Sequence, residues 1–192
     1  MRDRPVSRPR RSALLVAAGA LGALAASCGG GGSKDGTYSV PAAPYTFSYP
    51  KAFDETTPNT GAEFNGRPPT WKFAIGIDGA NVVVTETYTI KRPVESYKPA
   101  AFATFVDAAA RQIAKNNGSE VAKSSAGTLV GLTSHVYDLS ENDGGLATRL
   151  VFAFRGRTQY FVRCQWDEEG AKLVRPACAK VVSTMSVRTP SR

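Results

Sequence analysis

The chain has 192 residues, of which 42% are hydrophobic, and its 24 lysines and arginines outnumber its 16 aspartates and glutamates to give a formal charge of +8. It contains one histidine, His135, which excludes a histidine-rich zinc site. Five arginines and one aspartate precede residue 28, so residues 28–192 carry 19 basic and 15 acidic side chains, about +4. This mild balance, without clustered basic and aromatic residues, argues against nucleic acid as a partner.

Residues 1–27 have the pattern of a secretory signal peptide. An arginine-rich start precedes an uncharged run of Ala, Leu, Val and Gly over residues 13–26. This run is shorter than the roughly 18 apolar residues that a spanning helix needs. It ends in LAASC at residues 24–28, which resembles the bacterial lipobox, whose cysteine receives diacylglycerol before the chain is cleaved in front of it. The resemblance implies lipid on Cys28; the alternative is an ordinary signal peptide in which Cys28 is incidental.

The stretch that follows Cys28 is rich in glycine, and residues 28–44 are expected to form a lipidated N-terminus and a flexible tether. The glycines do not make a phosphate loop, because Lys34 is followed by Asp35 instead of Ser or Thr. Arg10 and Arg11 leave the export route open between the general secretory and twin-arginine systems. A single domain is expected over residues 45–188, with a loose tail at 189–192.

The other two cysteines form a natural pair once Cys28 is assigned to lipid. Outside the cytoplasm such a pair usually oxidises, so Cys164 and Cys178 are predicted to form a structural disulfide. Their wide spacing does not fit the Cys-X-X-Cys pattern of a redox dithiol.

The first half of the domain predicts strands followed by a helix. YTFSYP at 45–50 alternates as a half-buried strand does, and WKFAIGI at 71–77 with NVVVTETYTI at 81–90 predicts a hairpin about Asp78 and Gly79. Phe102, Val106 and Ile113 then recur at helical spacing, and the sequence NNG follows at 116–118. This pattern predicts an amphipathic helix that ends at the glycine.

The second half predicts more strands and a closing helix. TLVGLTSHVYDL at 128–139 reads as a strand, and LATRLVFAF at 146–154 with TQYFVRCQW at 158–166 predicts a second hairpin. A helix is expected from near Pro176, so that the disulfide would join it to the last strand. Together these elements predict an α+β domain with an antiparallel β-sheet covered by helices.

The chain resembles the PsbP-like fold as used in actinobacterial lipoproteins of the LpqN/LpqT type. The residues that carry the likeness are YTFSYPKAF, FATFVDAAARQI and FRGRTQYFVRCQW followed by Cys178, Val181 and Val182. The resemblance spans residues 45–187. It implies an accessory or binding module and supplies no catalytic residues and no cofactor.

The expected function is therefore a non-enzymatic binding or accessory module at the outer face of the cytoplasmic membrane, with an envelope protein complex, a wall polymer or a lipid as its partner. Arg149, Arg155, Arg157 and Arg163 cluster around one predicted hairpin and suit phosphate or carboxylate recognition. Their alternative role is a solvated hairpin edge.

Two other functions remain open. A lipid or glycolipid carrier would need an apolar cavity of roughly 300 Å³ or more between sheet and helix, lined by Trp71, Phe102 and Phe105. A hydrolase would use His135 and Asp138 as acid and base, but a spacing of three on a strand points them to opposite faces. No GxSxG sequence supplies a nucleophile, and no metal site is expected.

Overall fold

A computed structural model describes residues 35–57, 67–129 and 131–188 of the chain. These residues form one α+β domain in which every strand pairing is antiparallel, as predicted. None of their helices is long and apolar enough to cross a bilayer. The predicted signal peptide, Cys28 and the tail at 189–192 lie outside the described residues.

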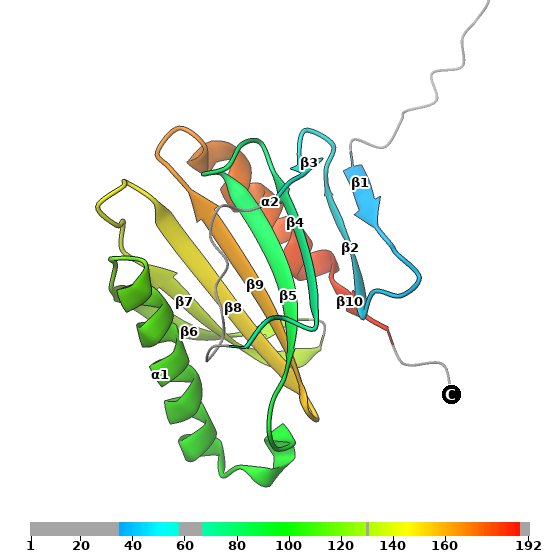
Figure 1. Cartoon of the computed structure of the whole chain (residues 1–192), viewed down its shortest axis with the longest axis vertical. Helices are drawn as coiled ribbons and strands as arrows, with labels where there is room; N and C mark the ends of the chain where they lie inside the picture. The colour runs from blue at the N-terminus through cyan, green and yellow to red at the C-terminus, as the bar shows by residue number, and fades with distance from the viewer. Residues whose placement is uncertain (1–34, 58–66, 130, 189–192) are drawn as a thin grey trace, which may run out of the picture. The chain divides into compact units, whose positions relative to one another are not determined.

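The larger sheet has seven described strands in the order β3-β4-β5-β9-β8-β7-β6 (Figure 1). They are β3 (Asp54–Glu55), β4 (Trp71–Gly76), β5 (Val82–Thr89), β6 (Val121–Leu129), β7 (Leu132–Leu139), β8 (Ala147–Arg155) and β9 (Thr158–Trp166). The hairpins β4–β5 and β8–β9 are the two that the sequence predicts. β9 lies between β5 and β8 and so joins the two halves of the sheet.

The segment 128–139 differs from its prediction as one strand. Gly131, with φ at 70°, turns the chain between Leu129 and Leu132, so the segment is divided between β6 and β7. Most of β6 comes from the preceding residues 121–127 (VAKSSAG), for which no strand was predicted.

A smaller sheet of described residues has the order β1-β2-β10, with β1 (Asp35–Tyr38), β2 (Tyr45–Pro50) and β10 (Ser186–Val187). β1 lies inside the stretch expected to be a tether, so the described part of the fold already includes Asp35–Tyr38, ahead of the expected start at Tyr45. Gly36 packs closely on the ring of Tyr49, where an added Cβ would lie 2.8 Å from Cζ. Its missing side chain therefore serves this close approach and not only flexibility.

One face of the larger sheet packs against α2 (Ala171–Thr184) and the smaller sheet. Ile75, Val83 and Val162 meet Val174 and Val181 there, all nearly fully buried. Cys164 on β9 and Cys178 on α2 are joined by a disulfide across this layer, with an S–S distance of 2.05 Å. The predicted pairing is confirmed.

The helix α2 begins earlier than expected. The Asp167 carboxylate accepts a 2.7 Å hydrogen bond from the Gly170 N–H, and the Asp167 carbonyl accepts one of 3.0 Å from Ala171. These bonds start the helix at Ala171 and place Pro176 inside it. The prediction of a start near Pro176 was wrong because the acidic turn satisfies the first N–H groups upstream of the proline.

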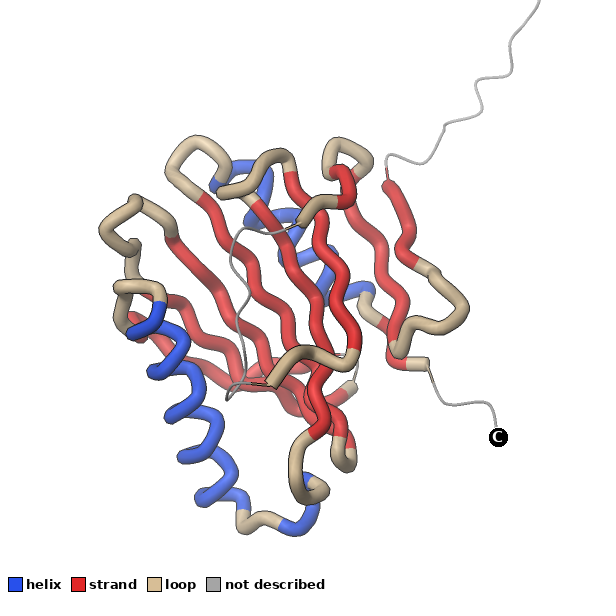
Figure 2. The backbone as a smooth tube through the Cα atoms, viewed as in Figure 1, coloured by secondary structure: helices blue, strands red, loops and turns tan. Residues whose placement is uncertain are grey.

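The opposite face of the larger sheet packs against α1 (Pro99–Asn116), and Figure 2 shows the two helices on opposite sides of the strands. The predicted stripe is confirmed: Phe102, Val106 and Ile113 are buried against a cluster that includes Leu150 and Phe152. A short 3₁₀ turn, η1 (Val94–Ser96), leads from β5 into α1.

Candidate functional site

A surface pocket of about 790 Å³ lies where the start of α1 meets the turn between β6 and β7. Its lining is mostly apolar, with one imidazole, one carboxylate and two hydroxyls. The lining residues are Val94, Glu95, Tyr97, Pro99, Phe102, Gly131, Leu132, Thr133, His135 and Phe154. The pocket is thus built from three parts of the chain that are distant in sequence.

The wall at 94–99 is fixed by hydrogen bonds to the β8–β9 turn. The Val94 N–H donates to the Gly156 carbonyl at 2.8 Å, and the Gly156 N–H donates to Glu95 Oε1 at 3.2 Å. Gly156 adopts a φ of 55°, which favours glycine. Pro99 then occupies the first turn of α1, where a missing N–H costs nothing. The position of this wall therefore depends on the turn of a different hairpin.

Aromatic rings form the inner surface of the pocket. The Phe102 ring from α1 lies edge-on to Phe154 of β8, with centroids 4.7 Å apart, and 5.4 Å from the Tyr97 ring. His135 of β7 is also edge-on to Phe102, at 6.3 Å. Such packing holds the rings in place, so the pocket offers a preformed apolar surface.

The environment of His135 keeps its imidazole uncharged at neutral pH. Burial lowers its pKa below the ordinary value of 6.5, and the Asp107 carboxylate only partly opposes this effect. Asp107 itself accepts a 2.5 Å hydrogen bond from the Tyr137 hydroxyl, which ties α1 to β7 beside the pocket. Burial raises the pKa of Tyr137, so this hydroxyl keeps its proton. The imidazole is therefore a neutral hydrogen-bonding group in an apolar wall.

His135 and Asp138 lie on opposite faces of the sheet, as their spacing predicts. His135 is opposite Phe152 on the α1 face, whereas Asp138 is opposite Arg149 on the other face. Asp138 accepts two hydrogen bonds from Arg149, at 2.6 and 3.1 Å. The two residues therefore cannot act together as an acid and base pair.

Only one of the three residues expected to line a cavity lies in this pocket. Phe102 does, and Phe105 packs beside it in the same cluster at 6.1 Å without lining the pocket. Trp71 packs on the opposite face, where its indole N–H donates to the Tyr38 hydroxyl at 2.7 Å. The expectation that Trp71 shares a cavity with Phe102 is corrected because the two side chains project from opposite faces.

The four arginines around the β8–β9 hairpin do not share one surface. Arg163 is 1% exposed and lies beside Glu86, and Arg149 is paired with Asp138 on the other face. Arg155 and Arg157 are exposed at the turn, where Arg157 also donates to the Ile90 carbonyl at 3.3 Å. The expected four-residue patch is thereby reduced to this exposed pair, because Arg163 is buried and Arg149 is held by Asp138.

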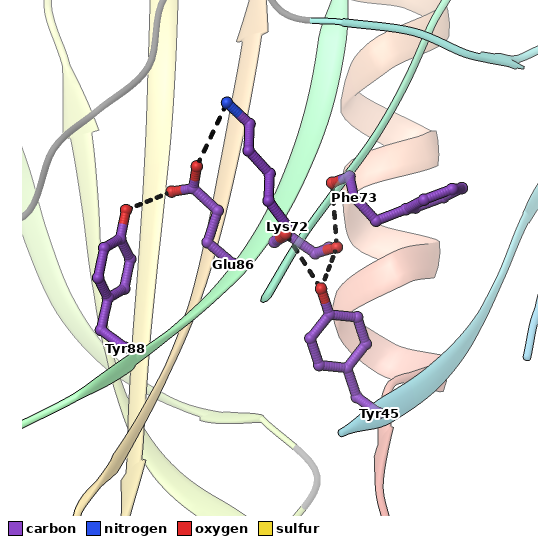
Figure 3. A network of polar contacts seen from close by, with 6 residues as sticks. Tyr45, Lys72, Phe73, Glu86 and Tyr88 are labelled. Atoms are coloured by element: carbon purple, nitrogen blue, oxygen red, sulfur yellow. Dashed lines mark hydrogen bonds and ion pairs between the residues drawn. The ribbon is translucent and has the colours of Figure 1, made fainter. Parts of the chain in front are cut away.

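A buried polar cluster surrounds Glu86 of β5 (Figure 3). No feature of the sequence predicts it, because Glu86 alternates normally with its neighbours along the strand. Glu86 is 1% exposed, accepts a 2.8 Å hydrogen bond from the Tyr88 hydroxyl and pairs with Lys72 Nζ at 3.7 Å. Burial raises the pKa of Glu86, and Tyr88, Arg163 and Lys72 partly oppose this. Because the Glu86 carboxylate is enclosed in this way, its role is in the fold, and a substrate cannot reach it.

A second polar network in Figure 3 anchors the smaller sheet to the larger one. The Tyr45 hydroxyl donates to the Thr85 carbonyl at 3.0 Å and lies 2.9 Å from Thr85 Oγ1, which in turn donates to the Phe73 carbonyl. Burial raises the pKa of Tyr45.

Among the described residues, no three His, Cys, Asp or Glu side chains are placed to hold a metal ion.

No family model matches the chain, and no curated protein matches its sequence. Among solved structures, the solution structure of cyanobacterial PsbP (CyanoP) from Synechocystis sp. PCC 6803 is similar, with a TM-score of 0.55 and 14% identity over 84% of this chain and 98% of that one. A crystal structure from Bacteroides thetaiotaomicron VPI-5482 has a TM-score of 0.52 and 13% identity over 83% of this chain and 50% of that one. At these identities the likeness shows the fold alone, and the predicted PsbP-like fold is confirmed.

Proposed function

We propose that the chain is a lipoprotein held at the outer face of the cytoplasmic membrane by diacylglycerol on Cys28, and that its domain is a non-enzymatic binding or accessory module. The arrangement of the three cysteines carries this proposal. Cys164 and Cys178 are joined to each other, which suits a compartment that permits disulfides. Cys28 is the remaining cysteine, and it stands at the end of a signal-like apolar run and before a glycine-rich stretch.

The site geometry supports binding over catalysis. The neutral His135 imidazole faces an apolar pocket, and the Glu95 carboxylate in the same lining accepts a hydrogen bond from the Gly156 N–H. The carboxylate closest to His135 in sequence, Asp138, is held by Arg149 on the other face. Catalysis by acid and base would need both groups within hydrogen-bond reach of one reacting atom. The fold of the PsbP-like neighbour is consistent with an accessory role.

The anchor is tested by the intact mass of the protein extracted from the membranes of a bacterial host that processes lipoproteins. The expected mass is that of residues 28–192 plus a diacylglycerol group. Cys28→Ser should leave the chain unlipidated, and Ser27→Ala, which keeps a small residue before the cysteine, should behave as the wild type. An unmodified Cys28 in the membrane fraction would refute the anchor.

The exposed Arg155 and Arg157 are the proposed contact with an anionic polymer or lipid. Arg155→Ser should weaken sedimentation with vesicles that contain an anionic lipid and leave the melting temperature unchanged, because the side chain is exposed. Lys123→Ser removes a charge from another exposed position, on β6, and serves as the control. Equal binding by both variants would remove the arginine pair from consideration.

The pocket favours a second candidate, a carrier of lipid or glycolipid. Its volume of about 790 Å³ falls within the range of ligand pockets, about 300–1,000 Å³. Thr133→Trp should fill the pocket from an exposed position, whereas Thr104→Trp places the same ring on the exposed face of α1. Mass spectrometry of lipid that copurifies with each variant should show loss only for Thr133→Trp; retention by both would reject this candidate.

A further inference from the structure

The strand β6 is the end strand of the larger sheet, and within the described residues it pairs with β7 alone. Residues 122–126 and Thr128 are exposed, so β6 is covered on neither face over most of its length. A strand that is held on one side only and is open on both faces contributes little apolar burial to the domain. It is instead an accessible template for another strand.

The backbone groups that β6 offers follow from its register with β7. Leu129 and Leu132 flank a two-residue turn, so they exchange hydrogen bonds with each other. Pairs alternate along an antiparallel ladder, and Gly127, Ser125 and Lys123 therefore also bond to β7. Ser124, Ala126 and Thr128 consequently direct their N–H and C=O groups outward.

The side chains of β6 lack the devices that usually block an edge. The residues from Ser124 to Leu129 include no proline and no charge, and the bulge in the strand lies at its start, between Val121 and Lys123. Edge strands that must stay unpaired commonly carry lysine or proline in their middle. The middle of β6 is occupied by serine, alanine and glycine.

We propose that β6 pairs antiparallel with β6 of a second copy of this chain, about a two-fold axis at Ala126. In this register Ala126 is opposite Ala126 of the second copy, and Ser124 is opposite Thr128, so the three outward residues of each copy exchange backbone hydrogen bonds. The only charged side chain of β6, Lys123, lies opposite Leu129 and meets no like charge. The strand is therefore complementary to itself.

The pairing closes at two copies. A two-fold contact uses the same surface on both partners, and it leaves no second β6 to continue the sheet. The strand at the other end of the sheet, β3, has two residues and is too short to recruit a further strand. The product is a dimer with one continuous sheet and not a fibre.

The test uses the full chain with Cys28→Ser, in detergent, with its mass measured by sedimentation equilibrium. The chain with the wild-type β6 should form dimers as its concentration is raised to about 1 mM. Ala126→Lys and Ala126→Glu each place like charges directly opposite one another across the axis and should weaken the dimer by up to about fivefold. When the two variants are mixed, opposite charges face each other and dimers should return.

Ala108→Lys and Ala108→Glu add the same charges to an exposed position of α1 and should leave the dimer intact. Equal melting temperatures would show that all four variants are folded. A wild-type chain that stays monomeric overturns the proposal. A dimer that persists unchanged in Ala126→Lys also overturns it, because another surface would then hold the copies together.

Discussion

Removing the disulfide between β9 and α2 should destabilise the domain by an amount that its loop length sets. The two cysteines are separated by 14 residues, and closing a loop of about 15 residues in the unfolded chain is worth about 3 kcal/mol at 25 °C. For a chain of this size that loss corresponds to a fall in melting temperature of roughly 6–12 °C. The effect arises mainly because the reduced unfolded chain gains conformations.

The assay is equilibrium unfolding in urea of the Cys28→Ser chain, with and without a reductant. Cys164 and Cys178 are 0% and 2% exposed, so the reduced protein keeps both sulfur atoms packed in the core. The difference between the oxidised and reduced chains therefore isolates the cross-link, and the double variant Cys164→Ala with Cys178→Ala adds the loss of packing. A difference below about 1 kcal/mol between the oxidised and reduced chains would refute the reasoning.

Three further predictions follow from buried contacts. Gly170→Ala should destabilise the domain by about 1–3 kcal/mol in urea, because the new Cβ would lie 1.7 Å from Asn81 Oδ1. Tyr88→Phe removes the hydroxyl that donates to the buried Glu86 and should cost about 1–3 kcal/mol at pH 7. Because the pKa of Glu86 is raised in the fold, its protonated form is favoured there, and the deficit should shrink as the pH falls toward 4.5. The pKa of His135 is lowered, so its contribution is lost as the pH falls below about 6.5, and His135→Gln should flatten the melting temperature between pH 7 and 5. A variant that melts like the wild type at every pH contradicts the corresponding contact.

The parts of the fold that the sequence predicts well are those with one buried face. The hairpin β4–β5 and the helix α1 have apolar residues at a regular period, and each was placed within a few residues of its bounds. β6 carries no such period because both of its faces are open, and Ser, Ala and Gly have no strong preference for strands. Pattern alone cannot find a strand that buries neither face.

The site could be predicted only in part for a related reason. Alternation along a strand assigns a side chain to a face, and it correctly separated His135 from Asp138. It does not say which strands are neighbours or which helix covers each face, so Trp71 was grouped with Phe102 although they lie in different layers. Only the order of strands in the sheet places Tyr97, Phe154 and His135 around one pocket.

The central place of β9 has a consequence for the order in which the domain can fold. β5 ends at Thr89. Its partner toward the centre of the sheet is β9, which is synthesised only when the chain reaches residues 158–166. A chain that emerges with its N-terminus first therefore holds the β4–β5 hairpin with one edge unsatisfied while most of the domain is still to come. Completion of the sheet waits for the last fifth of the polypeptide, and such long-range pairing is intrinsically slow. The β4–β5 half and the β6–β8 half of the sheet therefore become one structure only when β9 is in place between them.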